Sequence, residues 1–310
     1  MRGFALTVVG ALAASTFAFA EPMHAPHYGS VVVNGARLHF MEQGHGPTVI
    51  LVHGGLGDYT YWQGQIPALA ERYHVIAYSR RYDFPNDNPP IAGYSAVVDS
   101  EDLAALIRQL HLGPVYVVGH SYGALTALFL ARRHPDLLRA AVLAEAPAMS
   151  LLPSLHDKRE QGRAMYADVQ ERLVGPVKAA FAVGDTERGV AAFIDYVFAS
   201  PHAWSDFSLK DKAETIRDAH EWDVMIPSGE LFPEITSAQV HEIQTPVLLM
   251  SGGQSYPFLA MIDNELAYLL PHNRRIIYAD AGHQMWLKHP EECRKDAEAF
   301  FAENGGPAGE

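Results

Sequence analysis

Residues 115–123 read VYVVGHSYG, an apolar run that leads into the pattern Gly-x-Ser-x-Gly. The run 115–118 predicts a β-strand buried on both faces, and the pattern of residues 121–134 predicts a helix. Ser121 is therefore expected on a sharp turn between a strand and a helix, where neighbouring side chains would collide and glycine is required. Such a turn exposes the hydroxyl at a sheet edge, beside the positive end of a helix. Ser121 is a candidate nucleophile.

The sequence on both sides of this stretch alternates short apolar runs with helical patterns, which indicates a parallel sheet with crossover helices. Asn34-Gly35 predicts a hairpin turn between strands at 30–33 and 37–42. The other predicted strands are 48–52, 75–78, 140–143, 246–250 and 275–278, and the other predicted helices are 62–73, 96–111, 261–270 and 291–302. The expected fold class is α/β, with one open, mostly parallel sheet flanked by helices.

The strand–helix rhythm stops between residues 147 and 243, where helical patterns at 160–173, 186–198 and 211–220 are separated by prolines. We interpret residues 148–242 as a helical cap inserted into one core domain, formed by residues 21–147 and 243–303. The cap is rich in aromatic and apolar side chains, which suggests an apolar acyl or alcohol group in the substrate. The Gly-containing residues 304–310 predict a disordered tail.

The first 20 residues have the features of a secretory signal peptide. Arg2 precedes a short apolar run, and Ala18-Phe19-Ala20 provides a small-x-small cleavage site. An uncleaved membrane anchor is the alternative, but a membrane-spanning helix needs about 20 apolar residues and this run is shorter. We expect export to the periplasm or the medium, with no membrane anchor left after cleavage.

The composition excludes several classes of function. The 310 residues carry 23 Lys and Arg against 36 Asp and Glu, for a formal net charge of -13, and no basic stripe is present. This argues against a nucleic-acid partner and leaves a small molecule as the expected substrate. No metal-ligand cluster and no phosphate-binding loop is evident, so neither a metal nor another cofactor is expected. The single cysteine, Cys293, lies among charged residues and is expected on the solvent side of a helix.

A serine hydroxyl is a weak nucleophile without a base. His283, in Ala281-Gly282-His283, follows the predicted strand 275–278 by a short loop and precedes the C-terminal helix. This placement lets its imidazole reach back over the sheet edge. His272 and His289 are weaker candidates because each lies beside a helix end and a proline.

A histidine base needs a carboxylate that fixes its tautomer and stabilises the imidazolium. The segment after strand 246–250 reads Ser-Gly-Gly-Gln-Ser and contains no carboxylate. Glu145 directly follows strand 140–143, and the active groups of open α/β sheets gather at such strand ends. A carboxylate in that apolar run is costly unless it is paired. Glu145 is therefore the preferred acid, with Asp263 and Asp280 as alternatives.

Acyl transfer also needs backbone N–H donors for the oxyanion of the tetrahedral intermediate. The N–H of Tyr122, next after the nucleophile, is one candidate. The loop after strand 48–52 reads His53-Gly54-Gly55-Leu56-Gly57, and its glycines let the backbone approach a substrate oxygen. We expect the second donor to be the N–H of Gly55, with Leu56 as the alternative.

These three motifs, His53-Gly54-Gly55, Gly119-His120-Ser121-Tyr122-Gly123 and Gly282-His283, resemble in type and order those of the α/β-hydrolase superfamily. The resemblance covers about residues 30–145 and 240–300. It implies an eight-stranded, mostly parallel sheet and the chain order serine, acid, histidine. An acid after the sixth strand is similar to haloalkane dehalogenases, but these use an Asp nucleophile. Ser121 therefore argues against dehalogenase and epoxide-hydrolase chemistry.

The resemblance implies hydrolysis of a carboxylic ester, lactone or amide through an acyl-enzyme. Perhydrolase-type halogenation or C–C bond hydrolysis would use the same three residues. A slow-turnover ligand-binding or sensor protein on this scaffold is a further alternative. The loop after strand 75–78 borders the pocket in several relatives. Its Arg81 either binds substrate or pairs with Asp83 or Asp87.

Overall fold

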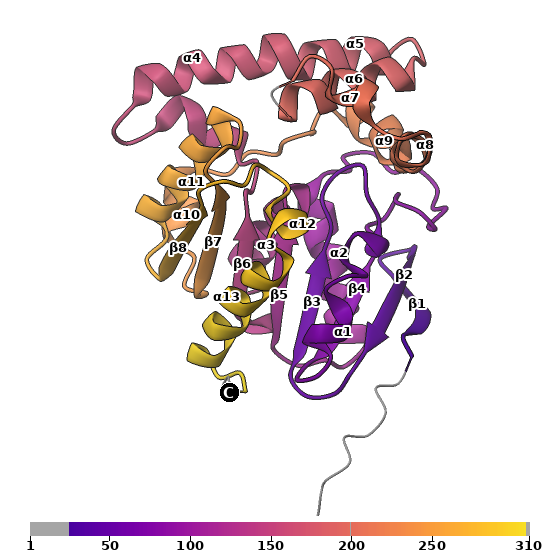
Figure 1. The fold of residues 1–310 in the computed structure, drawn as a ribbon, viewed down its shortest axis with the longest axis vertical. Helices are drawn as coiled ribbons and strands as arrows, with labels where there is room; N and C mark the ends of the chain where they lie inside the picture. The colour runs from indigo at the N-terminus through magenta and orange to yellow at the C-terminus, as the bar shows by residue number, and fades with distance from the viewer. Residues whose placement is uncertain (1–24, 199, 308–310) are drawn as a thin grey trace, which may run out of the picture.

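The computed structural model describes residues 25–198 and 200–307, so the predicted signal peptide at 1–20 lies outside the described residues. Eight strands form one sheet in the spatial order β1-β2-β4-β3-β5-β6-β7-β8 (Figure 1). The strands are β1 (His27–Val33), β2 (Ala36–Gln43), β3 (Thr48–Val52), β4 (His74–Tyr78), β5 (Val115–His120), β6 (Leu138–Ala144), β7 (Val247–Gly252) and β8 (Asn273–Tyr278). β2 pairs antiparallel with both neighbours, whereas all pairs from β4 to β8 are parallel. The predicted α/β class and mostly parallel eight-stranded sheet are confirmed.

Helices cover both faces of the sheet, which explains the continuous apolar runs of its central strands. Along β3, Ile50 and Val52 join the apolar cluster on one face, while Val49 and Leu51 join the cluster on the other. The first cluster contains residues of α2 (Ala96–Gln109), α3 (Tyr122–Arg133) and α11 (Pro257–Leu269). The second contains residues of α1 (Ile66–Leu69), α12 (Met285–Lys288) and α13 (Pro290–Glu303). The sheet is thus the middle layer of three.

Between β6 and β7 the chain is helical, and α4 to α9 lie beyond the edge of the sheet (Figure 1). The segment consists of η3 (Met149–Ser154), α4 (Arg159–Val169), the π-helix η4 (Gln170–Val174), α5 (Gly175–Phe181), α6 (Thr186–Val197), α7 (Ala203–Asp206), α8 (Leu209–Asp218), α9 (His220–Ser228) and α10 (Ser237–His241). From here on the name cap is kept for α4 to α9, which form the central part of the predicted insertion 148–242. Its buried side chains, such as Val169 and Trp222, belong to the same apolar cluster as Leu125 of α3. Cap and sheet therefore share one core.

Two local expectations are wrong. The helix predicted over residues 62–73 is instead a 3₁₀ turn, η1 (Tyr59–Trp62), followed by the short α1. The Asp58 carboxylate accepts a hydrogen bond from the Thr60 N–H at 2.7 Å and starts the turn early. Cys293 is fully buried, not solvent-facing. It shares a face of α13 with Ala297 and Phe301, because residues four and eight apart in a helix align. Its charged neighbours in the sequence occupy the other faces.

The tail expectation needs a partial correction, since residues 304–307 have a defined place. The Tyr116 hydroxyl donates to the Asn304 carbonyl at 3.0 Å, and the Arg72 guanidinium donates to the Pro307 carbonyl at 2.8 Å. The side chains of Tyr116 and Arg72 thus hold the backbone after α13, whereas residues 308–310 lie outside the described chain. None of the helices in the described ranges is long and apolar enough to cross a membrane.

Candidate active site

Ser121 lies on the turn between β5 and α3 with φ 53° and ψ -119°, a backbone conformation that is strained for a residue with a side chain. Glycine is required at positions 119 and 123 because there is no room for a side chain at either position. A Cβ on Gly119 would lie 2.4 Å from the Gly123 carbonyl oxygen, and one on Gly123 would lie 2.3 Å from that of Val52. The Ser121 N–H donates to the Ala144 carbonyl at 2.8 Å, which ties the turn to the end of β6. The predicted strand–turn–helix context of Ser121 is present.

Glu145 and His283, predicted as acid and base, are in direct contact. The Nδ1 atom of His283 lies 2.5 Å from Oε2 of Glu145, and the Gly252 N–H donates to Oε1 at 2.8 Å. Glu145 is fully buried at the carboxyl end of β6, and its φ of 54° is again in the left-handed region. The carboxylate occupies Nδ1, which leaves Nε2 as the free nitrogen of the His283 ring.

His120 fixes the backbone of His283 and was not anticipated from the sequence, where it is one of 16 histidines. Its Nε2–H donates to the His283 carbonyl oxygen at 2.8 Å, and its ring stacks on Tyr61 with centroids 5.2 Å apart. Burial, and secondarily the charge of His283, lower the pKa of His120 to about 3. His120 is therefore a neutral donor that positions His283.

Ser121 and His283 line the same two cavities under the cap. No hydrogen bond of the described residues joins the Ser121 hydroxyl to the His283 ring. Such bonds are often long or misaligned in ligand-free hydrolases and tighten when substrate binds. The shared cavities give the hydroxyl and the ring one common space in which a reacting group can sit.

The inner cavity is predominantly apolar, and the cap supplies part of its walls. Val177, Phe193 and Trp222 come from the cap, whereas Met149, Leu231 and Phe258 come from segments outside it. One carboxylate, that of Glu221 in α9, also faces it. The outer cavity is larger and more polar, and it meets the inner one at Gly55, Ser121, Phe193, Val197 and His283.

The two expected oxyanion donors lie at these cavities. Gly55 lines both, whereas the alternative Leu56, with φ 58°, lines only the outer one. Within the described chain the Gly55 N–H donates no hydrogen bond. Tyr122 lines the inner cavity as the first residue of α3, where a helix offers its N–H no partner. Both N–H groups are thus available to a substrate oxygen.

The alternative acids and bases lie elsewhere. Asp263 of α11 is buried and its Oδ2 lies 2.6 Å from the Ser251 hydroxyl; burial, and then the nearby Glu145 charge, raise its pKa to about 8. Asp280 is exposed and pairs with Lys288 and with His289. His272 is exposed as well. In the described chain none of these contacts the Glu145–His283 pair by a hydrogen bond.

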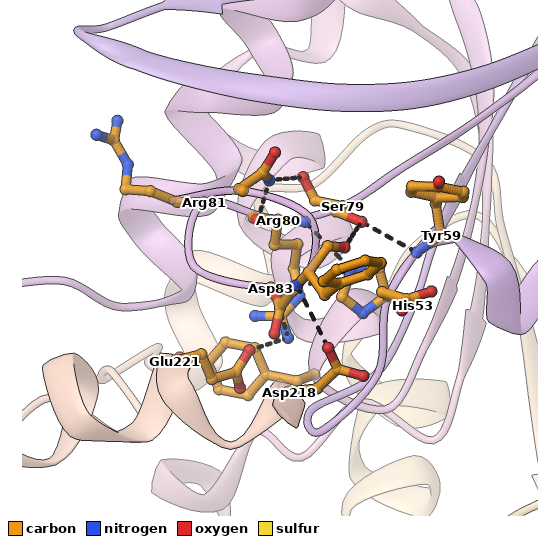
Figure 2. A network of polar contacts seen from close by, with 12 residues as sticks. His53, Tyr59, Ser79, Arg80, Arg81, Asp83, Asp218 and Glu221 are labelled. Carbon is orange, nitrogen blue, oxygen red and sulfur yellow. Dashed lines mark hydrogen bonds and ion pairs between the residues drawn. The ribbon is translucent and has the colours of Figure 1, made fainter. Parts of the chain in front are cut away.

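Arg81 has a structural partner that the sequence did not suggest. Its Nε and Nη2 atoms lie 2.7 Å from Oδ2 and Oδ1 of Asp102 in α2, so it pairs with neither Asp83 nor Asp87. Its side chain points away from that of Arg80 (Figure 2). The reason is position: Asp102 lies on the buried face of α2, within reach of the loop after β4. Among the described residues no group of three or more His, Cys, Asp or Glu side chains is arranged to hold a metal ion.

Known proteins are similar to this chain in sequence. "Uncharacterized hydrolase YraK" of Bacillus subtilis is 35% identical over 125 residues, 40% of this chain and 46% of that protein. "2-hydroxy-6-oxo-6-(2'-aminophenyl)hexa-2,4-dienoic acid hydrolase" of Metapseudomonas resinovorans is 27% identical over 286 residues, 88% of this chain and 90% of that protein. The chain matches only 25% of the length of "Bifunctional epoxide hydrolase 2" of Sus scrofa, at 31% identity, so it spans less than half of this relative and of YraK.

Among solved structures, carboxylesterase CesB from Bacillus subtilis superposes with a TM-score of 0.71 at 21% identity, over 92% of this chain and 93% of that one. At this identity the likeness shows the fold alone. Residues 47–290 match the family model described as "alpha/beta hydrolase fold". This match covers more than half of the chain, and with the sheet order and the strand–turn–helix at Ser121 it shows that the protein belongs to the α/β-hydrolase family.

Proposed function

We propose that this protein is a serine hydrolase that cleaves a carboxylic ester, or a lactone or amide, of a small and largely apolar molecule through an acyl-enzyme intermediate. The observation that carries the proposal is the 2.5 Å contact between His283 and Glu145, beside a strained Ser121 that lines the same cavities as His283. A base, its orienting acid and a serine on a strand–helix turn have this arrangement in acyl transfer.

In the proposed cycle the Ser121 hydroxyl oxygen attacks the substrate carbonyl carbon while Nε2 of His283 takes its proton. Glu145 stabilises the imidazolium, and the N–H groups of Gly55 and Tyr122 bind the oxyanion. Collapse of the tetrahedral intermediate expels the alcohol, which receives its proton from His283. Water then attacks the acyl-enzyme with His283 again as base, and the acid product leaves.

The cavity linings favour an uncharged substrate. Among the described residues that line the inner and outer cavities, the only Lys or Arg is Arg217. Arg217 is already paired with Asp58 and Asp218. A substrate carboxylate would therefore find no unpaired cation, and it would face the carboxylate of Glu221.

C–C bond hydrolysis is the second candidate, because the relative named as a dienoic acid hydrolase aligns over 88% of this chain. That relative's name specifies an acidic substrate, for which the cavities offer no unpaired cation. Ester cleavage is for this reason the preferred activity. The Ser121 position also counts against epoxide hydrolysis, in which a carboxylate attacks an alkyl carbon.

The test is active-site labelling combined with a substrate panel. A fluorophosphonate should label Ser121, and Ser121→Ala should abolish both labelling and turnover of p-nitrophenyl esters with acyl chains of increasing length. A parent protein that binds these esters without hydrolysing them would support the ligand-binding alternative. Turnover of a vinylogous 1,5-diketone acid in preference to every ester would support C–C hydrolysis.

We also propose that the chain is exported and that residues 1–20 are removed in the process. The support is the sequence alone: a positive start, a short apolar run and a small-x-small site before Glu21. Expression with these residues in a bacterial host should yield a protein outside the cytoplasm whose first residue is Glu21 by mass spectrometry. An intact Met1 in the cytoplasmic fraction would contradict the proposal.

A further inference from the structure

A fully buried arginine, Arg80, lies against the loop that carries the Gly55 N–H. Arg80 follows β4 on the adjacent loop, and its Nη2 donates to the Gly54 carbonyl oxygen at 3.1 Å. The same carbonyl accepts from Nδ1 of His53 at 2.8 Å, and Nε2 of His53 accepts from the Arg80 N–H at 3.1 Å. Figure 2 shows the Arg80 and His53 side chains close together in this network. Two donors thus fix one carbonyl group.

Fixing the Gly54 carbonyl also fixes the direction of the Gly55 N–H. The two groups belong to one planar peptide unit, and in a trans peptide they point in opposite directions. The Gly54–Gly55 bond is not among the cis peptides of the described chain. With its carbonyl held by Arg80 and His53, the peptide directs the Gly55 N–H away from Arg80. Gly55 lines the same cavities as Ser121.

Arg80 also contacts the residue that supplies the other donor. Its guanidinium carbon lies 5.0 Å from the centroid of the Tyr122 ring, and the Tyr122 hydroxyl accepts the Ala96 N–H at 2.9 Å. The ring is therefore held over one face by Arg80 and at its hydroxyl by Ala96. We infer that Arg80 is a positioning residue that holds the N–H groups of Gly55 and Tyr122, the two proposed oxyanion donors, in the orientation that binds a substrate oxygen. This inference rests on the proposed acyl-transfer function.

Three carboxylates hold the guanidinium in turn. Nη1 lies 3.1 Å from Asp99 in α2, Nη2 lies 3.3 Å from Asp83, and Nη2 also donates to Glu221 in α9 of the cap. Burial works against the charged guanidinium, but Asp83, Glu221 and Asp99 outweigh it and raise the pKa of Arg80 well above its ordinary value. These contacts require an arginine, because a planar guanidinium presents several N–H donors in fixed directions. The compact ammonium group of a lysine could not reach the carboxylates and the Gly54 carbonyl at the same time.

The pairing with Glu221 also protects the site electrostatically. A Cβ on Gly55 would lie 3.4 Å from Oε1 of Glu221, so this carboxylate is close to the expected oxyanion. A bare negative charge there would oppose the charge that develops in the transition state. Arg80, which donates to Oε2 of Glu221, offsets part of this charge, and the Trp222 indole N–H donates to Oε1 at 2.9 Å.

The experiment compares two ketone inhibitors of the same apolar chain on the full-length enzyme. A trifluoromethyl ketone accepts the Ser121 oxygen at its carbonyl carbon, the Ser121 proton goes to His283, and the carbonyl oxygen becomes an oxyanion. The corresponding methyl ketone binds without this addition.

Loss of a well-placed oxyanion donor costs about 100-fold or more in catalysis. For Arg80→Lys we expect the trifluoromethyl ketone to bind about tenfold or more weakly, with methyl ketone affinity and KM for esters nearly unchanged and kcat lowered.

Arg81→Lys is the matched control. It replaces a neighbouring buried guanidinium that has its own carboxylate partner, Asp102, and that points away from Arg80 (Figure 2). It should leave the ratio of the two inhibition constants unchanged. If Arg80→Lys does not fold, Arg80→Lys combined with Asp83→Asn removes one unpaired carboxylate and carries the same expectation.

The outcomes separate the two proposals. A folded Arg80 variant with the parent ratio of inhibition constants, or an equal change in Arg81→Lys, would overturn the role of Arg80 while leaving Ser121 as the nucleophile. A parent enzyme that the trifluoromethyl ketone does not inhibit more strongly than the methyl ketone would instead count against the acyl-transfer function itself.

Discussion

At the scale of single residues, the assignment of the acid depends on which carboxylate contacts His283. Glu145 does so at 2.5 Å, and its second oxygen accepts the Gly252 N–H. Replacing Glu145 by Gln keeps the size of the side chain but removes the charge that stabilises the imidazolium. We expect kcat for a simple ester to fall about 1,000-fold or more, with a much smaller change in KM.

Asp263→Asn is the natural comparison, because Asp263 was the alternative acid and is also buried. Its carboxyl group contacts Ser251 and not His283, so the variant should keep kcat within about twofold of the parent, well inside the effect of a lost orienting acid. The measurement is steady-state kinetics on the two purified variants, in which kcat of each is compared with that of the parent. An active Glu145→Gln beside an inactive Asp263→Asn would reverse the assignment.

The raised pKa of Asp263 also predicts how the free energy of unfolding depends on pH. Burial, and then the nearby Glu145 charge, raise its pKa to about 8 in the folded state, against about 3.9 for an unfolded Asp. The folded protein keeps this proton where the unfolded chain has lost it, so the contribution to stability is full below about pH 4 and is lost as pH rises through about 8. Asp263→Asn cannot titrate. The free energy of unfolding of the variant, relative to the parent, should therefore increase from pH 5 to pH 8, as measured by urea unfolding. A difference independent of pH would mean that Asp263 is ionised in the folded state.

At the scale of elements, the ends of the strands were the most predictable part of the site. A strand buried on both faces gives a continuous apolar run, so β3, β5, β6 and β7 are visible in the sequence together with the residues that follow them. Ser121 and Glu145 directly follow two of these strands, β5 and β6, whereas His283 follows the edge strand β8 by a short loop. Their meeting at one edge is a consequence of parallel pairing, which brings the carboxyl ends of all these strands to the same side.

What the sequence could not predict depends on contacts between elements that are distant in the chain. Arg81 pairs with Asp102 of α2, and Arg80 with Glu221 of α9, 141 residues away. Neither pairing follows from periodicity, because charge alone does not show which helix face approaches a loop. The burial of Cys293 was visible in principle, since Ala297, Phe300 and Phe301 follow it at helical spacing. The prediction placed Cys293 on the solvent side because the residues next to it in the sequence are charged, although in a helix those residues lie on other faces.

At the scale of the whole molecule, the cap and the sheet form the substrate site together because they share one apolar core. A further cavity lies beside the inner one, and the two have Met149, Val174, Leu231 and Phe232 in common. Its other walls are more polar and include Tyr166, Gln170 and Lys178. We interpret these four shared side chains as a partition between the two cavities; one of them, Val174, belongs to the π-helix η4.

This partition predicts a limit on the length of the acyl chain. Phe232 is the largest of the shared side chains, so Phe232→Ala should open the inner cavity toward its neighbour. Each additional methylene that becomes buried contributes about 0.8 kcal/mol, or about fourfold in kcat/KM. We expect the variant to shift its preference among p-nitrophenyl esters toward acyl chains longer by several carbons, with little loss on short ones.

Phe198→Ala provides the control for this experiment, because Phe198 is an aromatic residue of the same size that lines only the outer cavity. It should leave the dependence of kcat/KM on chain length unchanged. If Phe232→Ala retained the parent profile, or if both variants shifted it equally, the acyl group would not lie against the partition. The apolar chain would then extend into the outer cavity, and the inner cavity would hold the smaller part of the substrate.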